Sequence, residues 1–108
     1  MDTTERQIFI DKFLIPKDAI REFKDRTKIN MCIVTKQPGF IKEEAYERFD
    51  EHGNLICITM VVWKNFDAII KAKAAVQAEY EKQNFNPTEM MERLHITLER
   101  GIYMVVKN

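Results

Sequence analysis

Three side chains in this sequence have the chemistry to act on a small molecule. Trp63, the single tryptophan, ends the apolar run LICITMVVW, where its indole N–H can donate to a carbonyl or hydroxyl. Asp11 lies between Phe9 and Phe13 in an otherwise apolar run, where its carboxylate could act as a base. His95 belongs to the residue type that exchanges protons near neutral pH. These residues are the candidates for catalysis.

Each candidate also has a purely structural interpretation. A lone tryptophan at a strand end commonly packs in the core. A carboxylate in a strand commonly pairs with a basic neighbour, and a histidine after a helix commonly caps it or faces solvent. His52, in the DEHGN segment, is expected to be exposed. Tyr80 and Tyr103 could each hydrogen-bond a phenolic ligand, although a buried ring with a satisfied hydroxyl is the commoner arrangement.

The sequence contains no pattern for a metal or nucleotide cofactor. Its two histidines and two cysteines lie far apart and lack the local spacings of a metal site. The three glycines form no phosphate-binding loop, and no Ser-His-Asp or Cys-His motif is present. We therefore expect no metal and no cofactor.

Length and charge limit the classes of partner. A chain of 108 residues supports one domain, residues 1–108 with a core at about 7–106. Because 17 basic residues balance 17 acidic ones, the sequence favours neither nucleic acid nor an anionic membrane as a partner. It shows no signal peptide and no transmembrane run. Cys32 and Cys57 lie in apolar segments and are expected to be buried, reduced thiols, which fits a cytoplasmic location.

The first half of the chain predicts a strand, a helix and a hairpin. Residues 7–14 are β-rich and stop at Pro16, and apolar positions then recur every three or four residues up to Val34. A QPG turn follows. Residues 40–49 have a composition that suits a helix, but turns on both sides favour an edge strand, joined through residues 50–54 to a strand at 55–63.

The second half predicts two helices and a final strand. Asn65 is a suitable N-cap for a helix ending near Asn84. Asn86 is a suitable N-cap for a second, short helix, in which proline is the first residue and glutamate the third. Residues 96–106 form the last strand, in which Gly101 could mark a bulge. The order β-α-β-β-α-α-β predicts an α+β, ferredoxin-like fold with a four-stranded antiparallel sheet.

Both faces of the strand at 55–63 are apolar, and both faces of the last strand are nearly apolar. Helices cover only one face of such a sheet, so the other would expose a large apolar patch. The two chain ends contain too few residues to cover it. We therefore expect a homodimer with sheet packed against sheet.

Several segments in this order resemble the antibiotic biosynthesis monooxygenase domain. They are DKFLIPKDAIREF, QPGF, the pattern T-x-x-x-W-K-N at residues 59–65, AKAAVQAEY, NFNPTEMMERLHI and RGIY. The resemblance extends from about Ile8 to Tyr103. It implies a dimeric α+β barrel with a pocket in each protomer between the sheet and the helices.

The resemblance also implies an activity and a site. Known activities in the family include cofactor-independent oxygenation of phenols and quinols, and Trp63 matches the strand-final tryptophan that lines the pocket of its oxygenases. Thr59 stands where those oxygenases can carry asparagine, so identical chemistry is not implied. The candidate substrate-binding residues are Thr59, Phe13, Phe23, Met60, Tyr80 and Tyr103.

Two other functions remain open. The related haem-degrading branch places an asparagine on the first strand and an iron-ligating histidine on the second helix, and this sequence has neither. A dimeric small-molecule-binding or structural module without catalysis is the other alternative. A deep cavity lined by Trp63, with a polar group directed into it, would favour the enzyme. A cavity filled by Phe13, Phe23 or Met60 would favour the module.

Overall fold

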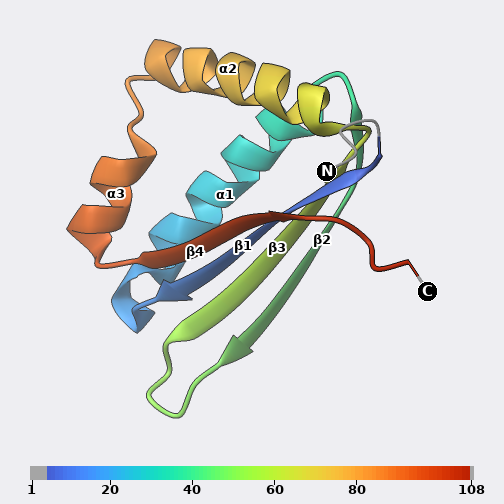
Figure 1. Cartoon of the computed structure of the whole chain (residues 1–108). Coiled ribbons are helices and arrows are strands. Elements are labelled where there is room, and N and C mark those ends of the chain that lie inside the picture. Colours follow the sequence, from blue (N-terminus) through green and yellow to red (C-terminus); the bar gives the residue numbers. More distant parts are fainter. Residues whose placement is uncertain (1–4, 108) are drawn as a thin grey trace.

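The computed structural model of the chain describes residues 5–107, which form a four-stranded antiparallel sheet with the helices on one face (Figure 1). The elements are β1 (Gln7–Ile15), a 3₁₀ turn η1 (Lys17–Ala19), α1 (Ile20–Val34), β2 (Phe40–Phe49), β3 (Leu55–Trp63), α2 (Phe66–Lys82), α3 (Pro87–Leu94) and β4 (Thr97–Tyr103). The strand order β2-β3-β1-β4 is that of the ferredoxin-like fold, which confirms the predicted fold class. None of the helices in the described range is long and apolar enough to cross a membrane.

Side-chain caps begin α2 and α3 where the sequence predicts. The Asn65 side-chain oxygen accepts a hydrogen bond from the Ala68 amide at 2.8 Å, and that of Asn86 accepts from the Glu89 amide at 3.1 Å. Each bond satisfies an amide that has no partner within its helix. Pro87 occupies the first turn of α3, where a missing N–H costs nothing.

Residues 40–49 form an edge strand despite their helix-favouring composition. β2 pairs with β3 alone, and all but its first residue are exposed. The turn that follows is held by Asp50, whose carboxylate accepts the amides of His52 and Asn54 at 2.8 and 2.9 Å. Pairing along the whole of β3 therefore outweighs the intrinsic helix propensity of this segment.

Several sequence predictions need correction. β4 ends at Tyr103 rather than near residue 106, and α2 ends at Lys82. Gly101 is not a bulge, since it pairs with Ile10 in unbroken register. A Cβ atom at Gly101 would instead lie 2.9 Å from the Tyr103 ring, which occupies that space. Cys32 is exposed, whereas Cys57 is buried, and neither thiol is in a disulfide.

The apolar layer between the sheet and the helices is divided into two clusters. The first, here called the α3 cluster, consists of Ile15, Ala19, Phe23, Leu55, Cys57 and Ile96. The second, the α2 cluster, consists of Val61, Trp63, Ala68, Ile69 and Ala72. The two clusters lie toward opposite ends of β1 and β3, and neither includes the residues midway along these strands.

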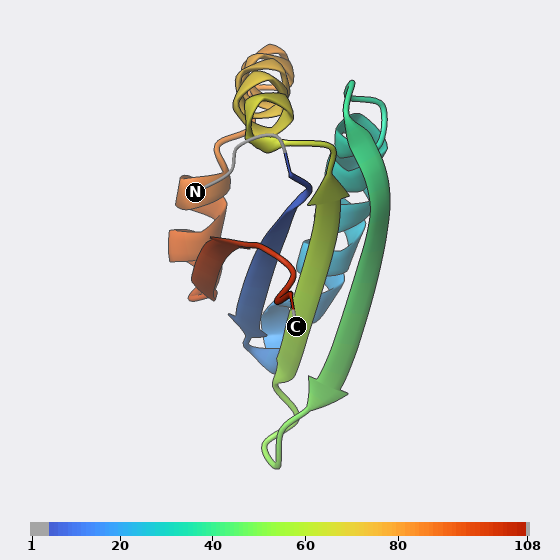
Figure 2. The same cartoon turned by 45° about the vertical axis from the view of Figure 1, so that its right-hand side comes forward.

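The opposite face of the sheet, here called the outer face, carries no helix (Figure 2). Strand alternation places Ile8, Ile10, Leu14, Ile56, Ile58 and Met60 on it, with Lys12 of β1 among them. The edge strands contribute charged side chains to the same face, Lys42, Glu44 and Arg48 from β2 and Glu99 from β4. An apolar centre with a charged border is typical of a protein interface.

Gly39 joins the end of α1 to the sheet in a conformation that only glycine adopts without strain. Its φ is +88°, and a Cβ atom there would lie 2.5 Å from the Cβ of Ala68 at the start of α2. Gly39→Ala is expected to reduce the free energy of unfolding by about 2–5 kcal/mol, through backbone strain and overpacking together. Urea denaturation measures this loss.

Gly53→Ala is the matched control, because Gly53 has a φ of +83° but only the Lys17 side chain near it, at 4.0 Å. It is expected to cost about 1 kcal/mol from the backbone alone. Equal losses in the two variants would contradict the proposed clash with α2.

Candidate functional site

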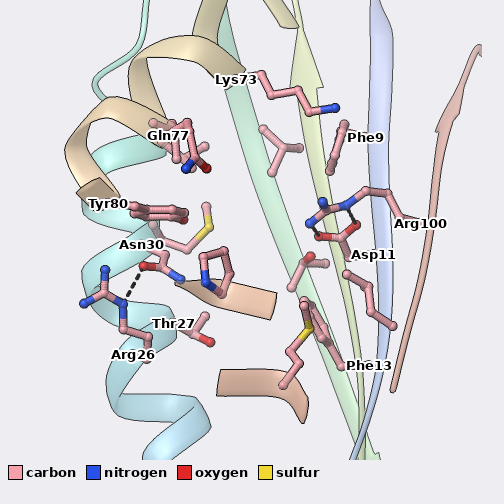
Figure 3. A pocket seen from close by; sticks show the side chains of 18 of the residues that line it. Phe9, Asp11, Phe13, Arg26, Thr27, Asn30, Lys73, Gln77, Tyr80 and Arg100 are labelled. Carbon is pink, nitrogen blue, oxygen red and sulfur yellow. Dashed lines mark hydrogen bonds and ion pairs between the residues drawn. The ribbon is translucent and has the colours of Figure 1, made fainter. Parts of the chain in front are cut away.

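A cavity of about 320 Å³ lies between the helix-covered face of the sheet and helices α1, α2 and α3. Its volume falls at the small end of the range of ligand sites in proteins. Its walls are mainly apolar and aromatic, with a few polar side chains from β1, β3, β4 and the helices (Figure 3). It separates the α2 cluster from the α3 cluster.

The sheet side of the cavity is crossed by a row of three polar residues. Thr59 on β3, Asp11 on β1 and Arg100 on β4 are direct partners across neighbouring strands, and all three line the cavity. This row, here called the polar row, stands at the midpoint of the strands. Apolar side chains cannot pack around it without leaving a carboxylate desolvated, so the two clusters stop on either side of it.

Asp11 and Arg100 form a two-pronged ion pair. The Arg100 Nε donates to Asp11 Oδ1 at 2.8 Å, and its Nη2 donates to Oδ2 at 3.0 Å. Asp11 is only 7% exposed, so the pair supplies the compensation that a buried charge requires. The hydrogen bonds that Arg100 donates to Asp11 raise the pKa of the guanidinium above its usual value. The Arg100 guanidinium also lies over the Phe9 ring, 4.9 Å from its centroid.

Helices α1 and α2 contribute polar groups to the opposite wall. Figure 3 shows Thr27 and Asn30 projecting from α1, with Gln77 and Tyr80 on α2. Burial raises the pKa of the Tyr80 phenol above its ordinary value. Within residues 5–107 the Tyr80 hydroxyl has no hydrogen-bond partner, so it can donate to a ligand.

Arg26 closes the cavity where α1 meets the segment after α2. Its Nε donates to Asn30 Oδ1 at 2.9 Å, and its Nη2 donates to Gln83 Oε1 at 2.6 Å. The guanidinium stacks on Phe85, 3.6 Å from the ring centroid, and lies 5.5 Å from that of Tyr80. Arg26 thus ties three segments together.

Aromatic rings lie toward both ends of the cavity. Trp63 is buried and packs edge-on against Phe40, with centroids 6.0 Å apart. Phe13 and Phe23 pack edge-on against each other at 5.0 Å in the wall, where they leave the cavity open. Flat apolar surfaces on either side of a polar row suit a flat, partly polar ligand.

The structure brings six of the predicted site residues to the cavity. They are Asp11, Phe13, Phe23, Thr59, Trp63 and Tyr80. Met60 and Tyr103 do not line it, because strand alternation turns both side chains to the outer face. His95 does not line it either. It is exposed and ends α3 in the left-handed conformation, with a φ of +58°.

Arg100 and Lys73 line the cavity but are not among the predicted site residues, although both carried a usable signal. Arg100 alternates with Leu98 and Ile102 on the helix-covered side of β4, the pattern that identified Asp11. Lys73 lies four residues after Ile69 and three before Val76, inside the apolar stripe of α2. At both positions the signal is a charged residue inside an apolar repeat.

The described residues, 5–107, contain no group of three or more histidine, cysteine or acidic side chains arranged to hold a metal ion. Neither His52 nor His95 lines the cavity. The cavity therefore lacks the imidazole ligand that haem iron most often takes.

Comparison with solved structures finds chains of the same fold. SnoaB, a cofactor-independent oxygenase from Streptomyces nogalater, is 19% identical over 96% of both chains, with a TM-score of 0.67. A dimeric ferredoxin-like protein from an uncultured marine organism is 8% identical, covering 95% of this chain and 97% of that one, with a TM-score of 0.69. A MhuD variant with two manganese protoporphyrin IX molecules bound per active site is 16% identical, covering 94% and 96%, with a TM-score of 0.67.

These similarities establish the ferredoxin-like fold over almost the whole chain. No model of a known protein family matches the sequence, and no curated protein matches it either. Function must therefore be argued from the cavity itself.

The ion pair in the polar row makes a testable contribution to stability. Arg100→Gln leaves the buried Asp11 carboxylate without its partner and is expected to cost about 2 kcal/mol at pH 7. This is less than for a fully buried pair, because Arg100 is half exposed. Adding Asp11→Asn removes the uncompensated charge and should recover at least half of that loss. Chemical denaturation of the two single variants, the double variant and wild type measures the coupling. A double variant no more stable than Arg100→Gln would show that the pair is energetically unimportant.

Proposed function

We propose that the chain is an antibiotic biosynthesis monooxygenase domain that oxidises a small aromatic compound with O₂, without a cofactor. The substrate would be a phenol, a quinol or a polyketide-like hydroxyaromatic. The observation that carries the proposal is the open, aromatic-lined cavity with Trp63 in its wall and the polar row on its sheet side. The fold shared with SnoaB, which is described as a cofactor-independent oxygenase, supports it.

Such a reaction needs no external reductant when the substrate supplies all the electrons. A phenol loses its hydroxyl proton, and the phenolate passes one electron to O₂. Recombination at the para carbon gives a hydroperoxide, which loses water to give a quinone. One oxygen atom enters the product and the other leaves in water, so a four-electron oxidation of the phenol balances the reduction of O₂.

The proposed role of the protein is to bind and orient the substrate and to accept its hydroxyl proton. Asp11 is the carboxylate among the cavity-lining residues and is the proposed proton acceptor. Trp63 provides an aromatic wall against which the substrate ring stacks, and the Tyr80 hydroxyl donates to a substrate oxygen. Thr59, between the Trp63 end and Asp11, is a further polar contact. His95 has no proposed role in this chemistry, because it lies outside the cavity.

The open cavity counts against a purely structural module. Phe13 and Phe23 stand in the wall and Met60 lies on the other face, so these side chains do not fill the cavity as a purely structural module would require. A haem-degrading function is not proposed, since neither histidine is positioned to ligate iron there. A binding module without catalysis is distinguished only by assay.

Oxygen uptake tests the proposal. Metal-free protein should consume O₂ with at least one of a panel of quinols and polyhydroxylated aromatics, faster than the spontaneous reaction. Trp63→Phe should lower this rate roughly tenfold or more by misplacing the ring. Phe40→Leu is the matched control, because it alters the packing of Trp63 without lining the cavity, and it should keep most of the activity. Ligand binding without uptake across the panel would replace the oxygenase with a non-catalytic module.

We further propose that the protein is a homodimer formed through the outer face. The two middle strands, β1 and β3, make the centre of that face apolar apart from Lys12, and charged side chains border it on the edge strands. A second copy presents the same pattern and can cover it around a two-fold axis.

Sedimentation equilibrium tests the dimer. Wild-type protein should have twice the mass of the chain, and Ile58→Glu on the outer face should give a monomer. Ile70→Glu is the matched control, because Ile70 is a half-exposed isoleucine on α2, away from this face, and it should leave the dimer intact. A monomeric wild type at micromolar concentration would contradict the proposed interface.

A further inference from the structure

The charges that line the cavity are unbalanced. Three cationic side chains, Arg26, Lys73 and Arg100, line it together with one carboxylate, that of Asp11. The chain as a whole has equal numbers of basic and acidic residues, so this excess is local. Apolar walls focus the field of such groups into a cleft, which favours an anionic ligand.

Arg26 lies across the cavity from Lys73 and Arg100 (Figure 3). Two of its nitrogens are bound to Asn30 and Gln83, and its guanidinium is stacked on Phe85. Its contacts hold the end of the cavity closed. A ligand anion beside the polar row therefore meets the other two cations, Lys73 and Arg100.

Arg100 has one nitrogen to offer. Its Nε and Nη2 are directed at Asp11, and Nη1 has no hydrogen-bond partner among residues 5–107. Because the guanidinium binds Asp11 through the edge that carries Nε and Nη2, Nη1 points away from the carboxylate, as Figure 3 shows. The Phe9 ring beneath the guanidinium keeps it in this orientation.

Lys73 approaches the same region from the opposite wall. Figure 3 shows its side chain extending from α2 toward Phe9 on β1. No carboxylate within residues 5–107 lies at ion-pair distance from its ammonium group. Lys73 is exposed, as is Lys71 two residues earlier, but Lys71 does not line the cavity and pairs with Asp67 at 3.1 Å.

We infer that the substrate of the proposed oxygenase is a hydroxyaromatic carboxylate, whose carboxylate is bound by Arg100 Nη1 and the Lys73 ammonium above Phe9. This inference rests on the proposed function and specifies its substrate class. Asp11 already offsets part of the Arg100 charge, so the site suits a singly charged carboxylate better than a doubly charged phosphate. The aromatic rings then occupy the apolar remainder of the cavity.

Isothermal titration calorimetry without O₂ separates binding from oxidation. The probes are 1-hydroxy-2-naphthoate and its neutral amide, 1-hydroxy-2-naphthamide, which have nearly the same shape. Wild-type protein should bind the carboxylate about tenfold more tightly, as expected for charge-assisted hydrogen bonds. Lys73→Gln should remove most of this preference, and the matched control Lys71→Gln should retain it.

A second variant tests Arg100 without removing it. Asp11→Asn takes away the competing negative charge while keeping a hydrogen-bond acceptor for the guanidinium. It should bind the carboxylate probe several-fold more tightly than wild type and the amide equally well, because only the charged ligand gains.

The outcomes separate the two proposals. Equal affinity for the two probes would overturn the carboxylate inference and leave the oxygenase proposal standing. A carboxylate preference that survives both Lys73→Gln and Asp11→Asn unchanged would overturn the assignment of these residues. Failure of both probes to bind would overturn the inference together with the aromatic-binding cavity on which it rests.

Discussion

The ion pair between Asp11 and Arg100 is the constraint around which the helix-covered side of this protein is organised. A carboxylate at the middle of a central strand would be costly in an apolar layer without a partner. Arg100, directly opposite on β4, binds both carboxylate oxygens. With the charge fixed at this point, the apolar core cannot be continuous, and it forms the α2 cluster and the α3 cluster with a cavity between them.

The cavity makes the fold less stable than a filled core would be. Filling it with larger apolar side chains would bury more surface and remove the loss of contacts around an empty space. Instead, the walls carry polar groups without protein partners, among them the Tyr80 hydroxyl and the Lys73 ammonium. Departures from a well-packed, fully satisfied core are common where a protein binds a ligand.

The two faces of the sheet carry different sets of side chains, because successive side chains of a strand point to opposite faces. Side chains at odd positions of β1 and β3 face the helices and build the cavity, and those at even positions, apolar apart from Lys12, form the centre of the outer face. The same strands thereby support both proposals, a ligand site on one side and a dimer interface on the other. A change in register by one residue would exchange the two sets and destroy both.

The sequence by itself determined the fold. Its alternation, its caps at Asn65 and Asn86 and its turns are local signals, and local signals fix which segments become strands and helices. The sequence also placed Thr59 and Trp63 on one face of their strand, because strand period is local too. Only the tertiary structure decided that Arg100, 89 residues from Asp11, is its partner, and that Lys73 approaches from the opposite wall. Contacts between distant residues depend on how strands and helices pack together, which no local pattern specifies.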